Sequence, residues 1–326
     1  MTETEAPLSP CPGEALVRVK KVGICGTDLH AFRGRQPFFS YPRILGHELG
    51  VEVMALGAGD TDGIAVGDRC AVEPYLNCGN CIACRNGKTN CCVSLKVLGV
   101  HTDGGMREII CVPTSKLHLS KTLSFEQLAL VETLGIGAHA VDRAKVEAEE
   151  QVLVIGAGPI GLGVMQFAKA AGARVVALDM NEQRLEFCKK EIGVETTILL
   201  GEGSQDEIRE ATGGDMPTVV FDATGNLASM QSAFGYVANG GRLVLVGLVL
   251  DNLSFYDPDF HRKEMTLLAT RNSTGNDFKR ILGLLESGEV DTAPWVTHRA
   301  NSETMIETFP EWLDPAKGVI KAVVSF

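Results

Sequence analysis

The chain has 326 residues, enough for about two domains of ordinary size. It is 45% hydrophobic and 22% charged, which is the composition of an ordinary globular protein. Its 30 basic and 41 acidic residues give a net charge of −11 without a strongly basic run, so we expect it to bind neither nucleic acid nor an anionic membrane.

No stretch approaches the roughly 18 apolar residues that span a bilayer. The longest apolar stretch, LVLVGLVL at 243–250, predicts a buried strand. The opening sequence MTETEAPLSPCPGEA has no apolar core and no basic start, so it does not resemble a secretory signal. We therefore expect a cytoplasmic protein, in which ten cysteines favour metal binding or catalysis over disulfides.

Residues 14–118 consist of short β-like runs that are separated by glycine-rich turns, with almost no helical periodicity. The runs are EALVRVKKVGI, GVEVMALG, DRCAVEPY and EIICVPTSKLHL. This pattern predicts a small, mostly-β barrel. Residues 122–146 then place apolar residues at helical spacing behind Ser124, a candidate N-cap, and predict a helix.

From Gln151 the pattern alternates between buried-strand runs and helical segments. The strand runs are QVLVIG, ARVVALD, TTILL, TVVFDAT and GRLVLVGL. Such alternation predicts a parallel sheet with crossover helices, and therefore the α/β class with a doubly wound sheet. The tail from about Glu264 mixes strand-like and helical pieces.

A glycine motif follows the first of these strand runs. Gly156, Gly158 and Gly161 stand in G-x-G-x-x-G spacing, which predicts a tight turn, close backbone approach to a pyrophosphate and close helix packing. The helix that begins there attracts phosphate at its N-terminus. Asp179 ends the next strand, where a carboxylate binds ribose hydroxyls and repels a 2′-phosphate, so we expect NAD rather than NADP. The surrounding strands and helix disfavour the alternative, a glycine-rich turn without a ligand.

Four cysteines in one short segment predict a zinc knuckle. They are Cys78, Cys81, Cys84 and Cys92, spaced C-x2-C-x2-C-x7-C. Four thiolates match a closed, tetrahedral, structural zinc site, for which we expect no catalytic role. Cys91 is an alternative fourth ligand, and disulfides or an iron–sulfur site are the alternative uses of the segment.

A second candidate metal set lies within the β-rich region. Cys25, His47 and Glu48 offer one thiolate, one imidazole and one carboxylate, which suit a catalytic zinc that keeps an open position. A lone cysteine is more often a buried apolar residue, so this interpretation depends on its neighbours.

The motifs GICGTDLH, ILGHELGVEV, VGDRCAVEPYLNCGNCIACRNGKTNCC and VLVIGAGPIGLG resemble the zinc-dependent medium-chain dehydrogenases. The resemblance covers nearly the whole chain and favours the polyol and sugar-acid branch, which includes sorbitol and threonine dehydrogenases. It implies a GroES-like zinc-binding catalytic domain at 1–122 and 270–326, and a Rossmann NAD-binding domain at 123–269. It also implies two zinc ions per chain and a homodimer or homotetramer.

The resemblance carries ligand roles to matching positions. Cys25 and His47 match the first two ligands of the catalytic zinc, and Glu48 matches a glutamate that binds the zinc in polyol-type members. Glu132 lies where other members place a cysteine or glutamate ligand, although ETLG replaces the more common glutamate–proline there. The implied zinc ligands are therefore Cys25 and His47 together with Glu48, Glu132 or both.

Three further residues of the ICGTDLH stretch match catalytic positions of the family. Asp28 matches the carboxylate that orients the histidine ligand, as metal-bound imidazoles generally require. Thr27 and His30 match a proton relay from the alcohol, through the cofactor ribose, to solvent. The alternative for His30 is an ordinary surface histidine.

The implied reaction is transfer of a hydride from a secondary alcohol to NAD⁺, with zinc as the Lewis acid. Thr224, in FDATGN, matches a segment that passes the nicotinamide, and the segments LVGL and TRNST at 245–248 and 270–274 are weaker candidates. The full set of predicted cofactor-binding residues is Gly156, Gly158, Pro159, Ile160, Gly161, Asp179, Arg184, Thr224 and Val246.

The sequence says least about the substrate. Phe38, Phe39, His101 and Arg107 lie near motifs that border the substrate in relatives. Arg107 or Arg271 would pair with a carboxylate and so favour a sugar acid over a neutral polyol, although each is equally well interpreted as a surface or core-edge residue. A threonine-type amino-alcohol dehydrogenase is the alternative enzyme, and a non-catalytic nucleotide-binding protein is the distant alternative.

One feature departs from the family pattern. Its members usually begin with a strand that has no match ahead of EALV in this sequence, so we expect either that the start of the sequence is short or that the barrel lacks an edge there.

Overall fold

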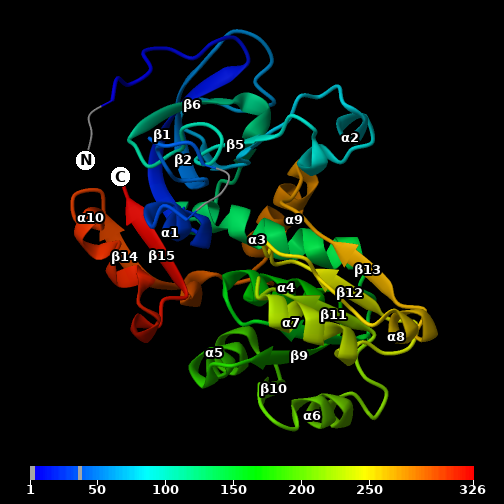
Figure 1. The fold of residues 1–326 in the computed structure, drawn as a ribbon. Helices are drawn as coiled ribbons and strands as arrows, with labels where there is room; N and C mark the ends of the chain where they lie inside the picture. Colours follow the sequence, from blue (N-terminus) through cyan, green and yellow to red (C-terminus); the bar gives the residue numbers. More distant parts are fainter. Residues whose placement is uncertain (1–3, 36–38) are drawn as a thin grey trace. The chain divides into compact units, whose positions relative to one another are not determined.

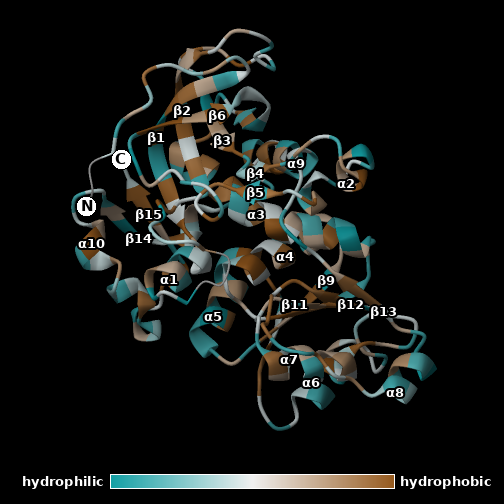
Figure 2. Ribbon diagram, turned by 45° about the horizontal axis from the view of Figure 1, so that its top comes forward, coloured by the Kyte–Doolittle hydropathy of each residue, from teal (hydrophilic) through white to brown (hydrophobic). Residues whose placement is uncertain are grey.

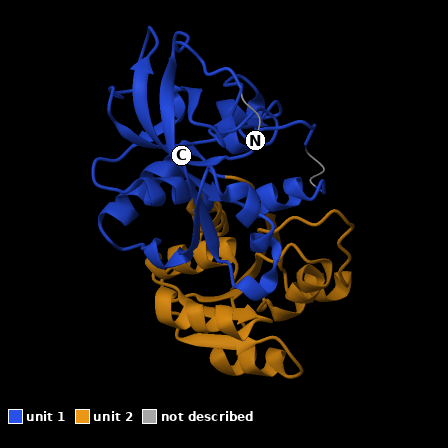
Figure 3. Cartoon of the chain, turned by 90° about the vertical axis from the view of Figure 1, so that its left-hand side faces the viewer, with its two compact units in different colours: residues 1–133, 273–326 blue, residues 134–272 orange. Residues whose placement is uncertain are grey.

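The structure is a computed structural model, and it describes residues 4–35 and 39–326. The chain divides into two compact units, which comprise residues 1–133 with 273–326 and residues 134–272 (Figure 3). The first division falls inside helix α3 (Phe125–Ala144). Ser124 caps this helix, because its Oγ accepts from Gln127 N at 3.2 Å while Gln127 Oε1 accepts from Ser124 N at 3.0 Å. The predicted helix and its cap are confirmed.

The first unit is built on a seven-stranded sheet that is antiparallel except for its β14–β15 pair (Figure 1). The path along the sheet is β14 (Val296–Asn301), β15 (Lys321–Ser325), β1 (Glu14–Ile24), β2 (Glu48–Leu56), β3 (Arg69–Val72) and β7 (Leu117–Leu119), and β6 (Ile109–Pro113) also pairs with β1. Strand β1 thus reaches three partners: β6 along its first half, β15 along its second half and β2 along most of its length. This confirms the mostly-β first domain.

Alternation along β1 and β2 builds the core of this unit. Val17, Val19 and Val22 are fully buried and pack with Val51 and Val53 of the neighbouring strand. The two-stranded ribbon of β4 (Tyr75–Leu76) and β5 (Lys96–Val97) brackets residues 78–92, which carry helix α2 (Ile82–Arg85). Helix α9 (Gly275–Glu286) completes the unit at its return from the second one, and α10 (Met305–Thr308) follows β14.

The region that carries ICGTDLH is helical, which the sequence pattern does not indicate. Helix α1 (Gly26–Phe32) begins after Cys25, whose extended backbone serves as N-cap. Asp28 forms the capping box, since its Oδ2 accepts from Cys25 N at 2.9 Å. A short polar interaction therefore overrides the β-like surroundings at this position.

The second unit contains a six-stranded sheet in which every pair is parallel. The order is β10 (Thr196–Leu199), β9 (Arg174–Asp179), β8 (Gln151–Ile155), β11 (Val219–Asp222), β12 (Arg242–Leu245) and β13 (Thr266–Ala269). In chain order this is 3-2-1-4-5-6, the doubly wound arrangement that binds dinucleotides where the strand order reverses, between β8 and β11. The predicted Rossmann sheet is confirmed.

Helices connect these strands and bury their apolar sides on the sheet. They include α4 (Pro159–Ala170), α5 (Glu182–Phe187), α6 (Ser204–Ala211), α7 (Leu227–Ser232) and α8 (Asp257–Arg262). Figure 2 shows the strands β11 and β12 mainly in brown, in keeping with the buried Val220, Phe221, Leu243 and Val244. Sheets that are covered on both faces require such continuous apolar strands.

The prediction of one buried strand over 243–250 is wrong. Strand β12 ends at Leu245, and Leu248 and Leu250 are about two-thirds exposed, at 67% and 70%. The chain leaves the sheet because Val246 N and Gly247 N both turn to Asp222 O, at 2.9 and 3.0 Å. An apolar run alone does not mark the end of a strand, since the end depends on which carbonyl the next N–H meets.

No helix within the described residues is both long and apolar enough to cross a membrane.

Candidate functional site

Cys25, His47 and Glu48 meet in the first unit. One ligand atom from each lies within 4.8 Å of the others, and His47 and Glu48 are buried. Cys25 stands at the start of α1, whereas His47 and Glu48 stand at the start of β2. The helix start and the strand start therefore converge on one point, and the predicted set is assembled.

Asp28 orients this set from behind. It is fully buried, its Oδ2 accepts from Cys25 N, and its Oδ1 lies 3.7 Å from His47 Nδ1. With Asp28 facing Nδ1, the other ring nitrogen of His47 is the one available to a metal. Burial raises the pKa of Asp28. Burial alone would lower the pKa of His47, but the charge of Asp28 and the contact with Cys25 raise it well above its ordinary value.

Glu48 occupies space that a glycine leaves open. Gly23 pairs with Glu48 across β1 and β2, and a Cβ at Gly23 would lie only 2.0 Å from Glu48 Oε2. That oxygen is buried without a hydrogen-bond partner, whereas Oε1 accepts from Lys321 Nζ at 2.5 Å. A buried carboxylate oxygen without a donor is costly unless a further group binds it.

The donors fit zinc. Among the described residues, a thiol, an imidazole and a carboxylate with one unpartnered oxygen converge without a fourth protein ligand, which matches a catalytic site with an open position. Lys321 is a buried cation of β15 that the sequence reasoning missed. The only signal was a single lysine inside the apolar run GVIKAVVSF.

Glu132 does not belong to the three-residue set. It is buried in α3, and its Oε1 accepts a short hydrogen bond from the hydroxyl of Tyr75. Burial raises the pKa of Glu132, and burial together with the nearby Glu132 raises that of Tyr75 well above its ordinary value. Nothing in the sequence around Tyr75 indicates this contact.

Thr27 and His30 both lie on α1, next to the metal-competent set. Thr27 is half-buried and His30 is exposed. This gradient suits a path from a buried group to solvent, but the relay through both residues stays a prediction. Of the residues predicted to border the substrate, Phe38 lies outside the described residues.

The four predicted knuckle cysteines form the second metal-competent set. The sulfurs of Cys78, Cys81, Cys84 and Cys92 all lie within 4.8 Å of one another, and Cys91 is not among them. Backbone N–H groups point at these sulfurs, including Cys78 N and Ser94 N toward Cys92 Sγ at 3.3 and 3.4 Å. Hydrogen bonds from the backbone of Cys84 and Val93 lower the pKa of Cys81 to about 6. Four sulfurs with a partly formed thiolate fit a closed zinc site.

The second unit builds the predicted glycine turn. Gly156 follows β8 with φ +97°, which favours glycine, and Gly158 caps α4 with Pro159 and Ile160 in its first turn. A Cβ at Gly161 would lie 1.8 Å from Gly156 O, so only glycine lets the helix pack this closely on the turn. The open N-terminus of α4 is suited to phosphate.

The remaining predicted cofactor residues lie at the carboxyl ends of neighbouring strands. Asp179 ends β9 and its two oxygens accept from Ala157 N at 2.6 Å and Asn181 N at 2.8 Å, which fixes the carboxylate against the glycine turn. Its remaining lone pairs are free for ribose hydroxyls. Arg184 lies close to the glycine turn, because its Nη1 is 3.9 Å from the position that a Cβ would take if residue 158 carried one.

Asp222 arranges the residues at the end of β11. Thr224 Oγ1 donates to Asp222 Oδ1 at 2.7 Å, and Val246 N donates to Asp222 O. Thr224 also lies beside Gly156, since its Cγ2 would be 3.1 Å from a Cβ there. The predicted dinucleotide-binding residues thus gather at one edge of the sheet, where open α/β sheets bind ligands.

Comparison with known families agrees with this architecture. The alcohol dehydrogenase GroES-like domain family matches residues 11–122, and the zinc-binding dehydrogenase family matches residues 159–287. An L-galactonate-5-dehydrogenase of Escherichia coli K12 is 42% identical over 319 residues, which cover 97% of this chain and 94% of that protein.

Two solved structures differ in their cofactor. An alcohol dehydrogenase (rspB) of Escherichia coli CFT073 in complex with NADH is 30% identical, with a TM-score of 0.90 over 99% of this chain and 94% of that one. A zinc-binding dehydrogenase of Sinorhizobium meliloti 1021 bound to NADP is 26% identical, with a TM-score of 0.89 over 99% and 94%. The chain therefore belongs to the zinc-dependent medium-chain dehydrogenases, in the polyol and sugar-acid branch, and is an alcohol oxidoreductase.

Proposed function

We propose that the protein oxidises a secondary alcohol of a sugar acid or polyol with NAD⁺. The observation that carries this proposal is the Cys25–His47–Glu48 set, in which His47 and Glu48 are buried and Glu48 Oε2 has no partner, in a chain whose second unit has a dinucleotide-type glycine turn. When bound, zinc lowers the pKa of the alcohol and NAD⁺ accepts the hydride from the carbinol carbon. Cys25, His47 and Glu48 would hold the catalytic zinc, and the four knuckle cysteines would hold a second, structural one.

NAD is the proposed cofactor rather than NADP. Asp179 is held by Ala157 N and Asn181 N, so its negative charge stays at the position where a 2′-phosphate would sit. Arg184 lies by the glycine turn, over Gly158, where it would serve the pyrophosphate.

The polar residues of α1 move the alcohol proton in this proposal. The Thr27 hydroxyl would accept the proton of the alcohol while it passes its own proton on, by way of the cofactor ribose, to His30, which would release a proton to solvent. Asp28 keeps His47 oriented throughout, since the backbone of Cys25 and Gly46 holds it in place at 2.9 and 3.4 Å.

Arg107 supports a sugar acid as the substrate. The segment 104–106 pairs with residues 44–46, just ahead of His47, through hydrogen bonds such as Gly105 N to Gly46 O at 2.8 Å. Arg107 follows directly, is half-buried, and is oriented by its Nε, which donates to Gly104 O at 3.1 Å. A guanidinium that reached the Cys25–His47–Glu48 set from this position would pair with a substrate carboxylate, and the E. coli relative named for L-galactonate points to the same class.

The test is NADH formation from aldonates, neutral polyols and L-threonine, with Cys25→Ser as control. We expect the highest kcat/KM with an aldonate of about six carbons, less with polyols, and no turnover by the control. Arg107→Leu should lose the preference for aldonates over polyols. NADH from threonine alone would favour the amino-alcohol alternative, and no NADH from any substrate, or full activity of Cys25→Ser, would refute the proposal.

We also propose a cytoplasmic location and a homodimer or homotetramer. All ten cysteines are free, which suits a reducing compartment. Strand β13 is an edge strand of the six-stranded sheet, and the exposed Leu248 and Leu250 follow its neighbour β12. A second copy of the chain that bound there would cover both the free strand edge and these apolar side chains. Fractionation and sedimentation test these statements, and a monomer at micromolar concentration would contradict the second.

A further inference from the structure

Two buried carboxylates, those of Glu48 and Glu132, are the candidate carboxylate ligands of the metal at Cys25 and His47. In each of them one oxygen accepts a hydrogen bond, but the donors differ in kind. Glu48 Oε1 accepts from the ammonium of Lys321, and Glu132 Oε1 accepts from the neutral phenol of Tyr75. Glu48 belongs to the set with Cys25 and His47, whereas Glu132 stays outside it. The protein therefore distinguishes between its two candidate carboxylate ligands.

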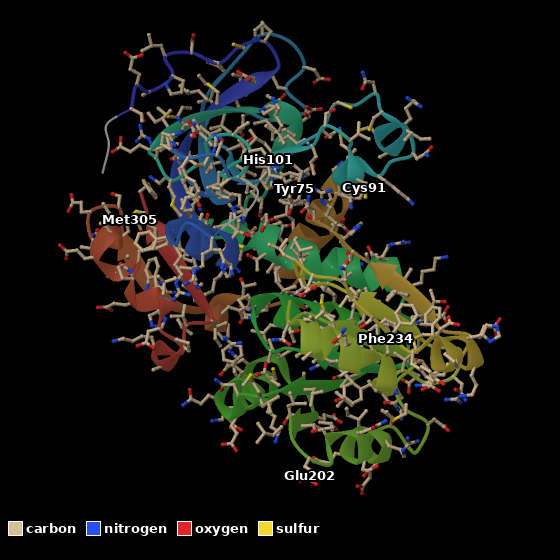
Figure 4. The ribbon with its side chains drawn as sticks, in the orientation of Figure 1. Tyr75, Cys91, His101, Glu202, Phe234 and Met305 are labelled. Carbon is tan, nitrogen blue, oxygen red and sulfur yellow. The ribbon has the colours of Figure 1, made fainter. Side chains whose placement is uncertain are left out.

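Tyr75 is placed for this contact by the strand that leads into the knuckle. It is only 2% exposed, and it lies in β4, whose pairing with β5 closes the base of residues 78–92. Figure 4 labels Tyr75 together with Cys91 of that segment. A buried phenol needs a partner for its hydroxyl, and here the partner is Glu132.

We propose that Tyr75 is a positioning residue that holds Glu132 out of the metal's ligand set, so that Glu48 is the carboxylate ligand and the fourth position stays open for the alcohol. This inference rests on the proposed function, because it assumes a metal at Cys25, His47 and Glu48. It assigns a role to a tyrosine that lies outside the three-residue set.

The reason lies in what Glu132 does without the phenol. Removal of the hydroxyl leaves a buried carboxylate oxygen without a donor, which is unfavourable in the metal-free protein. A bound metal offers that carboxylate a new partner. The phenylalanine variant should therefore bind metal more tightly while losing the open position that the alcohol needs.

The experiment uses the full chain loaded with Co²⁺ in place of zinc, with the knuckle's four-thiolate signal as internal reference. We compare the wild type, Tyr75→Phe, Glu132→Gln and the double variant by visible absorption and by metal release to a chelator. We expect Tyr75→Phe to change the absorption of the catalytic Co²⁺, to slow its release to the chelator, and to raise KM for the alcohol. In the Glu132→Gln background the same substitution should change none of these.

Unchanged spectra and release in Tyr75→Phe would overturn the inference, as would an identical change in the presence and absence of Glu132. If Tyr75→Phe does not fold, Glu48→Gln and Glu132→Gln decide the question. We expect the catalytic metal to be lost in Glu48→Gln and retained in Glu132→Gln, and the opposite result overturns the inference. A wild type that binds metal only at the knuckle would instead refute the proposed function.

Discussion

The two metal-competent sets of the first unit are built in opposite ways. The knuckle takes four identical ligands from residues 78–92, and three of its four sulfurs belong to residues that are not buried. The Cys25–His47–Glu48 set takes three different ligands from a helix start and a strand start, and its buried partners Asp28 and Lys321 come from α1 and β15. The knuckle ligands are close together in the chain and fill all four positions of a tetrahedral metal. The ligands of the Cys25–His47–Glu48 set come from separate elements and leave a fourth position open.

We expect this difference between a structural and a catalytic zinc site. The knuckle sulfurs are organised by nearby backbone N–H groups, which is enough to close a loop around a metal. The Cys25–His47–Glu48 set is held by charged side chains in a buried environment, where each unpaired charge is costly. A metal at the knuckle should therefore support stability, and a metal at the catalytic set should support chemistry.

The largest effects should come from removing one thiol of each set. Both Cys25→Ser and Cys81→Ser should reduce the zinc content from two to one per chain. We expect Cys25→Ser to lower kcat/KM on the order of 10³-fold or more, since a Lewis-acid metal contributes several kcal/mol to the transition state. Cys81→Ser should instead make residues 78–92 sensitive to protease and retain measurable turnover.

Metal analysis, steady-state kinetics and limited proteolysis check this pair of variants. Cys91→Ser is the matched control, because Cys91 is exposed and outside the knuckle set, and it should keep both metals. Loss of both metals in either single variant would show that the two sets are not independent.

Features that depend only on residues close together in the chain, such as the knuckle, were predictable from the sequence. The glycine turn at 156–161, the parallel strands around it and the cysteine spacing each depend on residues that are close in the chain. Their backbone requirements, such as the positive φ of Gly156, leave a direct mark on residue type.

Lys321 and Tyr75 were not predictable, because their contacts depend on strand register. Lys321 meets Glu48 only because β15 and β2 both pair with β1, and a shift of one residue would turn Lys321 to the other face. Tyr75 meets Glu132 because β4 and the first part of α3 belong to one unit, although the two residues are far apart in the chain. Their residue types alone carry no sign of these contacts.

A medium effect should follow from breaking the buried ion pair behind the catalytic set. Lys321→Met leaves Glu48 charged and without its buried partner, and such a loss costs about 3–5 kcal/mol. The metal-free protein should lose this much unfolding free energy in urea, whereas the zinc-loaded protein should lose less, because zinc then balances Glu48. Lys317→Met, on an exposed lysine, should change stability by no more than about 0.5 kcal/mol. Equal losses with and without zinc would argue against Glu48 as a zinc ligand.

The smallest difference between the two sets should appear on mild acidification. Cys81 has a pKa of about 6 and is mostly a thiolate at about pH 7, whereas His47 has a raised pKa in the metal-free protein and must lose its proton to bind a metal. The proton on His47 stabilises the metal-free fold fully below the ordinary pKa of 6.5, and this contribution is lost as the pH rises through the raised pKa. Burial raises the pKa of Cys84 in the knuckle, but Cys81 already supplies a thiolate, so we expect protons to compete with the metal more strongly at the Cys25–His47–Glu48 set. Dialysis from about pH 8 to about pH 6 should therefore release the catalytic metal before the knuckle metal. Zinc content and residual activity measure the order of release. Release in the reverse order would contradict the roles that we assign to the two sets.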